Sequence, residues 1–379
     1  MKDAHAFQDD PLGFLDRALP LAGDSVWLPH RQLCLTEASA SRSVLANDDG
    51  LYDDHSDFFH TRRGPFGPRR LQVRIRRATL ALLTRHHSAQ EKSLPALVED
   101  ALAPLSDWPD AGNWLAYRFF SPVLVAPRRP RSLHRTVERI VRSSVLAGAR
   151  ERGSSLGRLL YRLRTQWSLL SAIEDARREG SEAPGDVLQA LVQAAPEAAD
   201  DDLAEVFLSF LFAAAGSVGF VLGWSVYLAA SHPDAENRPA WVVREALRLW
   251  PVAWFLARRP ATLHRVAGEE VGPEDSVVVC PYAAHRSPRH WDQPERYRPE
   301  RWAGPITPPA FIPFGAGPHR CIAASLSMRW TEEVLRLLLE RYALKLVSSQ
   351  TRPQVGPALA PPRFSLELEP LPPRPPERR

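Results

Sequence analysis

The stretch Phe314-Gly315-Ala316-Gly317-Pro318-His319-Arg320-Cys321 decides the fold. Its glycines and proline predict a tight turn, and the apolar run from Ile322 to Leu339 predicts a helix directly after it. A cysteine held at the start of a helix is stabilised as the thiolate by the helix dipole and by free N–H groups. The thiolate is the form that binds metals, so Cys321 is either a metal ligand or an inert buried thiol that follows a turn.

The composition is that of a globular enzyme. The 379 residues are 44% hydrophobic and 24% charged, with a net charge of +4. So small an excess does not favour nucleic acid, and the chain has no basic run with interleaved aromatic side chains. Three lysines against 45 arginines, together with 36 prolines, are typical of a GC-rich bacterial genome.

The cysteines and the apolar stretches bear on the location of the protein. Cys34, Cys280 and Cys321 are scattered and form no C-x-x-C pair, so we expect no disulfide framework and no zinc site. A reducing cytoplasm is the expected location. The longest apolar stretch, from Val206 to Ala230, carries small and polar residues throughout, which favours a buried helix over a membrane span.

Helical patterns dominate the chain, and short strands interrupt them. Residues 25–37 alternate as two strands, and residues 277–280 form a buried one. Glycines and prolines make residues 48–69 rich in loops. Proline breaks divide a helical region over residues 94–194. Three arginines of that region are expected to be ordinary solvated charges, with a partner-docking face as the alternative: Arg128, Arg129 and Arg131.

A long helix is predicted from the acidic residues 200–202 to about Ala230, where Ser231-His232-Pro233 stops it. Thirty residues at 1.5 Å each give about 45 Å, enough to cross a domain.

A second motif comes shortly afterwards. Glu245 and Arg248 lie at i and i+3, on one helix face. Residues 297–302, Tyr-Arg-Pro-Glu-Arg-Trp, follow later. Together with the intact Phe-Gly-x-Gly-x-His-x-Cys pattern of residues 314–321, these motifs resemble the cytochrome P450 family.

The resemblance implies a mainly α fold with small β-sheets (α+β). In that fold haem b, iron protoporphyrin IX, is buried between the long central helix and the helix after the cysteine. We expect a single haem-binding domain over residues 1–369 and a disordered tail rich in proline and arginine over residues 370–379.

The resemblance also assigns roles to individual residues. Cys321 would be the proximal iron ligand. In the family, the carboxylate and two arginines at the positions of Glu245, Arg248 and Arg301 form a network behind the haem loop. The residues that would bind the cofactor are Arg76, Arg258, Phe314, Gly315, Gly317, His319 and Cys321. Arg76 follows Gln72 where the family has Trp or His followed by Arg.

The central helix departs from the family pattern. The family carries Ala-Gly-x-(Asp/Glu)-Thr, an acid and an alcohol that deliver protons, where this chain has residues 215–219, Ala-Gly-Ser-Val-Gly. Val218 and Gly219 therefore leave the acid and alcohol positions empty. Ser217 would substitute only in part, because it comes too early in the sequence and faces another side of the helix. The substrate, ordered water, or a different oxygen chemistry would compensate, and Gly219 is expected to leave room above the iron. The predicted pocket residues are Ala215, Gly216, Val218, Gly219, Val252 and Trp254.

The function implied is that of a monomeric monooxygenase that uses dioxygen and electrons from a ferredoxin and its reductase. The expected substrate is a polar, bulky secondary metabolite, with a peptide as one candidate class. Oxidative decarboxylation, ring coupling and peroxide-driven oxidation in natural-product or antibiotic biosynthesis are alternatives within the enzyme class. A non-catalytic haem-binding protein that recruits partners is the alternative from another class.

Overall fold

The computed structural model describes residues 2–19, 23–53, 56–146, 155–179 and 183–372. The chain forms two compact units built from alternating stretches of sequence. The first unit comprises Met1–His55, Asp234–Ala324 and Pro353–Ala360, and the second comprises Ser56–Pro233, Ser325–Arg352 and Pro361–Arg379. A single domain over residues 1–369 stays a prediction. Of the predicted tail, residues 373–379 lie outside the described residues.

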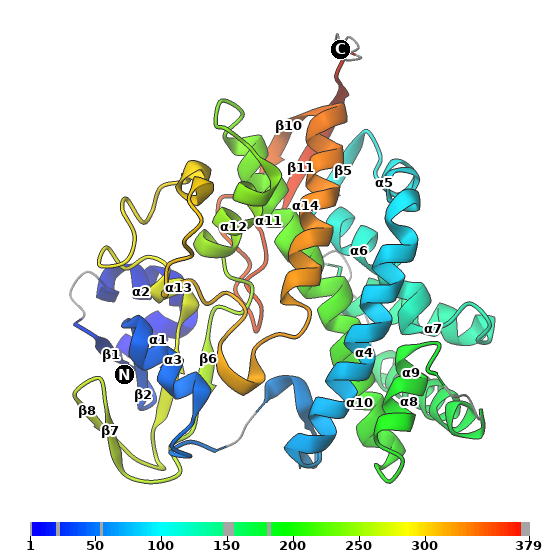
Figure 1. Ribbon diagram of the computed structural model, residues 1–379, viewed down its shortest axis with the longest axis horizontal. Helices are drawn as coiled ribbons and strands as arrows, with labels where there is room; N and C mark the ends of the chain where they lie inside the picture. Colours follow the sequence, from blue (N-terminus) through cyan, green and yellow to red (C-terminus); the bar gives the residue numbers. More distant parts are fainter. Residues whose placement is uncertain (1, 20–22, 54–55, 147–154, 180–182, 373–379) are drawn as a thin grey trace. The chain divides into compact units, whose positions relative to one another are not determined.

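A four-stranded sheet organises the first unit (Figure 1). Its order is β1 (Ser25–Leu28), β2 (Gln32–Leu35), β9 (Ser276–Val279) and β6 (Leu256–Arg258), where β2 and β9 are parallel and the other pairs antiparallel. The predicted strands within 25–37 and at 277–280 are confirmed. The remaining elements of this unit are α1 (Lys2–Asp9), α2 (Pro11–Ala18), α3 (Ala38–Ala46), α12 (Pro239–Leu249), β7 (His264–Val266), β8 (Glu269–Val271), α13 (Pro281–Ala284), and the 3₁₀ turns η6 (Pro299–Ala303) and η7 (Gly317–His319).

The second unit is mainly helical. Its sheets are small: β10 (Tyr342–Ser349), β11 (Phe364–Pro370) and β5 (Leu105–Trp108) form one, and β3 (His60–Thr61) and β4 (Gly64–Pro65) the other. Its helices are α4 (Arg69–Gln90), α5 (Leu94–Ala101), α6 (Asp110–Leu124), α7 (Arg131–Ser144), α8 (Ser155–Arg178), α9 (Val187–Ala194), α10 (Asp200–Phe212), α11 (Val218–Ser231) and α14 (Ala324–Arg341), with the 3₁₀ turns η2 (Asp57–Phe59) and η3 (Glu91–Ser93). The predicted class, mainly α with small β-sheets, is confirmed.

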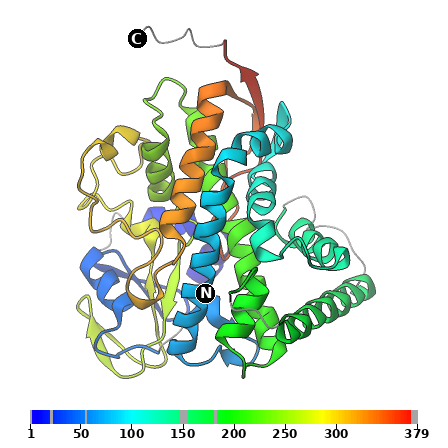
Figure 2. The same ribbon diagram turned by 45° about the vertical axis from the view of Figure 1, so that its right-hand side comes forward.

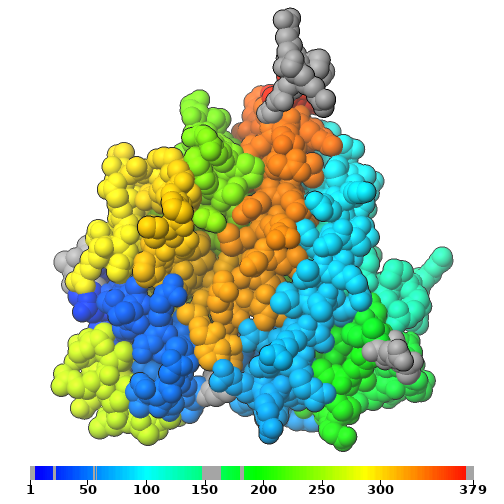
Figure 3. All heavy atoms as spheres, in the orientation of Figure 1, coloured from blue at the N-terminus to red at the C-terminus, as the bar shows by residue number. Residues whose placement is uncertain are grey.

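Helices α4 and α14 lie side by side in this unit (Figures 1 and 2). His87 of α4 and Glu333 of α14 join them, with His87 Nε2 2.9 Å from Glu333 Oε2. Figure 3 shows the outer side chains of both helices at the same face, α14 in orange and α4 in blue to cyan. Because α14 follows Cys321 in the chain, this pairing fixes the helix on the carboxyl side of that cysteine.

The predicted long helix is confirmed, with one irregularity. Helices α10 and α11 are continuous through η5 (Ala213–Ser217), a π-helical stretch that we call the π segment. There the N–H of Val218 donates to the carbonyl of Ala213, five residues back instead of four. π-helical turns inside α-helices are frequent at functional sites.

The helix of residues 200–231 is long and apolar enough to cross a membrane by length and composition alone. Of its most apolar window, 56% is buried inside the structure.

Candidate active site

The turn that carries Cys321 has the geometry its glycines predict. Gly315 and Gly317 have φ angles of +69° and +65°, which favour glycine. The N–H of Cys321 donates to the carbonyl of Phe314 over 3.0 Å and closes the loop of residues 314–321, the Cys321 loop. Helix α14 begins at Ala324, so the expected helix start at Ile322 is two residues too early. The cause is the turn itself, which continues through residues 322 and 323.

The Cys321 loop is anchored in the core of the first unit. Ala316, and Ile312 just before the loop, belong to a buried cluster with Leu33, Leu45 and Val279 from α3 and the sheet. Because apolar side chains on both sides of Gly315 are buried, the path of the backbone is fixed. Cys321 itself is exposed.

A buried ion pair on α12 forms the second part of the site. Glu245 and Arg248 are both 0% exposed, and Arg248 Nη2 lies 2.8 Å from Glu245 Oε1. The other guanidinium N–H groups donate to Glu245 Oε2 at 2.9 Å and to the carbonyls of His285, Pro294 and Arg296 at 3.0, 2.6 and 3.0 Å. All five guanidinium donors thus have partners, which is what a buried charge requires.

Residues after Tyr297 donate further hydrogen bonds to the Glu245 carboxylate. Arg301 Nε donates to Glu245 Oε1 over 3.1 Å, and the N–H of Arg298 donates to the same oxygen over 3.0 Å. The indole N–H of Trp302 donates to Oε2 over 2.9 Å. The structure therefore brings Glu245, Arg248 and Arg301 together, and adds an indole and a backbone amide that the sequence did not indicate.

His285 connects this network to the Cys321 loop. Its Nε2 accepts the N–H of Ile312 over 2.9 Å, so the proton is on Nδ1, which donates to the carbonyl of Arg248 over 3.1 Å. Burial, and then the charge of Arg248, lower the pKa of His285 to about 3, so the ring is neutral. The carbonyl of Ile312 in turn accepts the N–H of Gly315 over 3.0 Å. A continuous hydrogen-bonded path thus runs from Arg248 to the turn that carries Cys321.

Comparison with known proteins places these features in a family. The sequence model described as Cytochrome P450 matches residues 240–368, which contain the Glu245 network and the Cys321 loop. The human protein named Cytochrome P450 4V2 is 29% identical over 186 residues, 41% of this chain and 35% of that protein. The Cyclooctat-9-en-7-ol 5-monooxygenase of Streptomyces melanosporofaciens is 29% identical over 212 residues, 47% of this chain and 46% of that protein.

Solved structures are similar over nearly the whole chain. P450BioI, in complex with an acyl carrier protein that carries hexadec-9Z-enoic acid, has a TM-score of 0.73 at 16% identity and is matched over 97% of this chain and all of its own. The chain has the cytochrome P450 fold, and its residues 240–368 match the family model. The hydroxylase HmtN of himastatin biosynthesis has a TM-score of 0.72 at 17% identity, over 94% of this chain and 97% of its own. The matched parts span about a third to a half of the length of the curated relatives.

The three thiols of this protein differ in whether they could bind a metal. Cys34 and Cys280 are both fully buried. A hydrogen bond with Cys280, and then burial, raise the pKa of Cys34 well above its ordinary value, so Cys34 stays protonated. Cys321, in contrast, is exposed on a closed turn. The Cys321 loop therefore fits a haem held through a thiolate.

The side chains expected at the cofactor divide between the two units. Arg258 on β6 and His319 in η7 belong to the first unit, as does Cys321, and a Cβ built at Gly315 would lie 3.6 Å from Leu256 Cδ1 of β6. The Cys321 loop therefore lies next to the strand of Arg258. Arg76 belongs to α4 of the second unit.

Gln72, four residues before Arg76, stands where the family has Trp or His, and the structure shows a different role for it. Its side chain is buried, and its Nε2 donates to the carbonyl of Phe66 over 3.2 Å. Gln72 thus holds the loop before α4, whereas the family has Trp or His at this position.

The predicted pocket residues of the first unit are buried against residues 356–359. The indole N–H of Trp254 donates to the carbonyl of Gly356 over 2.8 Å, and the carbonyl of Val252 accepts the N–H of Leu359 over 2.9 Å. Their exposed fractions are 7% and 8%. Both residues are thus held in place by backbone contacts, and their part in substrate binding stays a prediction.

Gly219 of the long helix lies where this helix packs against α6. Ala215, Gly216 and Gly219 are buried, whereas Ala213, Ala214, Ser217 and Val218 are half-buried and form the accessible face. A Cβ at Gly219 would lie 2.5 Å from both Cα and Nδ2 of Asn113 on α6. The expectation that Gly219 leaves room above the iron is therefore wrong. Its missing side chain lets α6 approach the helix, and the hydroxyl on the accessible face of residues 213–219 is that of Ser217.

Replacing Gly219 by alanine should therefore destabilise the protein by about 1 to 3 kcal/mol, the usual cost of overpacking a core. The contact atoms include backbone of Asn113, which cannot rotate away. Gly216→Ala is the matched control, because a Cβ there meets only Val145 Cγ1, at 3.8 Å. Urea unfolding midpoints measure both variants. Equal midpoints would show that α6 does not depend on Gly219.

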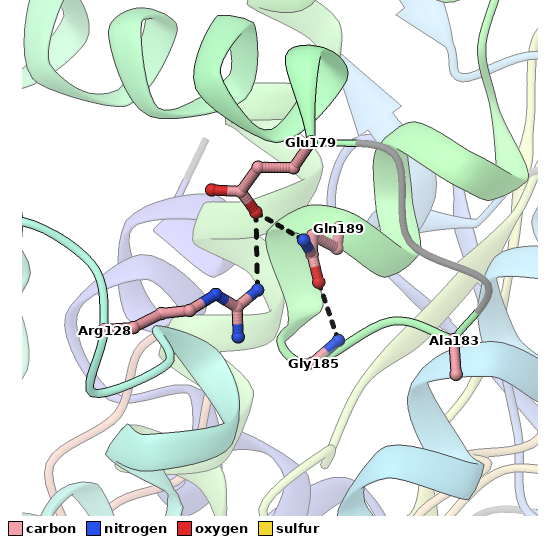
Figure 4. A pocket seen from close by; sticks show the side chains of 5 residues that line it. All are labelled: Arg128, Glu179, Ala183, Gly185 and Gln189. Carbon is pink, nitrogen blue, oxygen red and sulfur yellow. Dashed lines mark hydrogen bonds and ion pairs between the residues drawn. The ribbon is translucent and has the colours of Figure 1, made fainter.

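A small cavity of about 280 Å³ in the second unit is lined by the charged side chains of Arg128 and Glu179 and by the amide of Gln189 (Figure 4). Arg128 Nη2 lies 3.3 Å from Glu179 Oε2, which also accepts from the Gln189 side chain. The next residue in the sequence, Arg129, is 5% exposed, and its Nε lies 2.8 Å from Asp186 Oδ2. The expectation of an ordinary solvated charge is thus wrong for Arg129, because it pairs with a fully buried carboxylate that also caps α9.

Proposed function

We propose that this protein is a haem-thiolate monooxygenase whose iron is held by Cys321. The observation that carries the proposal is the accessible thiol of Cys321 on a turn that is tied to a buried ionic network. A haem bound through a thiolate supplies the cleavage of dioxygen and the oxidation of unactivated C–H bonds. The chain would supply the ligand, the propionate partners Arg258, His319 and Arg76, and the orientation of the substrate.

The proposed substrate is a bulky secondary metabolite, with a peptide as one candidate class. Among the proteins of similar structure, HmtN is a hydroxylase of himastatin biosynthesis, and a mutant of EryK is in complex with erythromycin B. The monooxygenase from Streptomyces acts, by its name, on cyclooctat-9-en-7-ol. A ferredoxin and its reductase are the proposed electron donors, and a monomer in the cytoplasm is the proposed state.

The proposed proton route avoids an acidic side chain, since Val218 is at that position. Ser217 offers a hydroxyl on the accessible face of the long helix, and water or a polar group of the substrate would supply the rest. Oxidative decarboxylation remains the second candidate, because the missing acid at Val218 favours chemistry that does not depend on ordinary proton delivery.

The test uses an extract of the source organism in which this gene has been deleted. Purified protein, a ferredoxin, its reductase and NADPH are added under ¹⁸O₂, and the extract is searched by mass spectrometry. The expected products carry one ¹⁸O atom and are missing when Cys321→Ser protein is used. Products lighter by carbon dioxide would favour decarboxylation. No change with either the reductase system or peroxide would contradict the proposal and favour a non-catalytic haem protein.

A further inference from the structure

Asn113 reaches the π segment from a neighbouring helix. It lies on α6, is 0% exposed, and its Nδ2 donates to the carbonyls of Ala215 and Gly216 over 2.8 and 3.0 Å. Both acceptors belong to the π segment, where the ordinary helical hydrogen bonding is shifted by one residue. One amide group thus uses both of its N–H bonds to hold two successive carbonyls of the irregular turn.

Only one orientation of this amide is chemically sensible. If the oxygen and nitrogen were exchanged, Oδ1 would face two carbonyl oxygens and make no hydrogen bond with either. The nitrogen is therefore the atom that faces Ala215 and Gly216, and Oδ1 points away from them. Gly219 makes this arrangement possible, since any side chain there would overlap with Asn113.

The oxygen of the same amide is buried and has no hydrogen-bond partner among the described residues. Buried amide oxygens in folded proteins almost always accept a hydrogen bond, from protein or from an internal water. Because Oδ1 belongs to the amide that holds the π segment, a donor bound to it lies beside that segment.

We propose that Asn113 is a positioning residue for proton delivery: its Nδ2 holds the π segment in its widened form and its Oδ1 binds an internal water there. The role in proton delivery rests on the proposed function, whereas the role in holding the π segment does not. An internal water is a source of protons that a chain without the acid and the alcohol at Val218 and Gly219 would need. Asn113 lies on the buried face of this segment and the Ser217 hydroxyl on its accessible face, so the proton would cross the widened turn between them.

Hydrogen exchange tests the structural half and needs no substrate. Asn113→Leu keeps the branched shape of the side chain and removes both donors and the acceptor, and Asn113→Ser keeps one donor and leaves space for water. Amide protons of residues 213–222 should exchange about tenfold faster in Asn113→Leu and to a smaller extent in Asn113→Ser. Ser225→Ala is the control, because the buried Ser225 hydroxyl donates to the carbonyl of Val221 in its own helix, at 2.8 Å. Unchanged exchange in both Asn113 variants would overturn the proposal.

The fraction of the supplied electrons that ends in hydrogen peroxide tests the role of Asn113 in proton delivery. Asn113→Leu should raise that share at least several-fold with the substrate found above, and Ser225→Ala should leave it unchanged. Faster exchange with an unchanged peroxide share would overturn the role in proton delivery. If the protein binds no haem through a thiolate, the proposed function fails and the exchange data still decide whether Asn113 holds the π segment.

Discussion

Replacement of Glu245 by alanine should lower the free energy of unfolding by roughly 3 to 5 kcal/mol, the usual cost of breaking a buried ion pair. The variant leaves the guanidinium of Arg248 buried without its counter-ion, and it removes the acceptor of Arg301 and Trp302. Urea unfolding followed by circular dichroism measures the loss. We also expect reduced haem content, because Arg248 is linked through His285 to the Cys321 loop.

Glu236→Ala is the matched control for Glu245→Ala. Glu236 pairs with Arg238 at the surface, where the two side chains are 54% and 62% exposed. Exposed pairs of this kind contribute at most about 1 kcal/mol. A loss below about 1 kcal/mol for Glu245→Ala as well would show that the network does not stabilise the first unit.

Replacement of Gly317 by alanine should cost about 2 to 5 kcal/mol and displace the Cys321 loop. The φ angle of +65° strains any residue with a Cβ, at roughly 1 to 2 kcal/mol. In addition, the new Cβ would lie 2.5 Å from the carbonyl oxygen of Leu45 and 2.6 Å from Cα of Ala46, both backbone atoms of α3. That overlap adds an overpacking cost of about 1 to 3 kcal/mol.

Gly315→Ala separates these two causes. Gly315 has nearly the same φ angle, +69°, but its nearest neighbour would be the flexible end of Leu256 at 3.6 Å. Gly315→Ala should therefore lose only the roughly 1 to 2 kcal/mol of backbone strain. Comparison of unfolding midpoints and of haem content after gel filtration checks both variants. Equal losses would mean that contact with α3 does not fix the loop.

Local features of the fold were predictable from the sequence. The glycines of the Cys321 loop, the i, i+3 spacing of Glu245 and Arg248, and the acidic start of the long helix are all local signals, and each is found in the structure close to the expected residues. The helix after Cys321 begins two residues late because turn and helix patterns overlap there.

The contacts between distant elements were not predictable in the same way. Asn113 is about a hundred residues from the π segment in sequence, and nothing in either stretch indicates that they meet. The purpose of Gly219 depends on that contact, so the sequence alone suggested empty space instead. Arg129 looked like a surface charge because its partner, Asp186, lies 57 residues away. Contacts between residues far apart in the sequence therefore decide the roles of Gly219 and Arg129, and the local sequence does not indicate them.

The absorption spectrum of the reduced protein under carbon monoxide tests the central claim most directly. Native protein and Cys321→Ser protein are reduced and exposed to carbon monoxide side by side. Thiolate ligation by Cys321 predicts a strongly red-shifted Soret band in the native protein and none in the variant. A folded native protein without haem, or with a band typical of histidine or protonated thiol ligation, would contradict the claim.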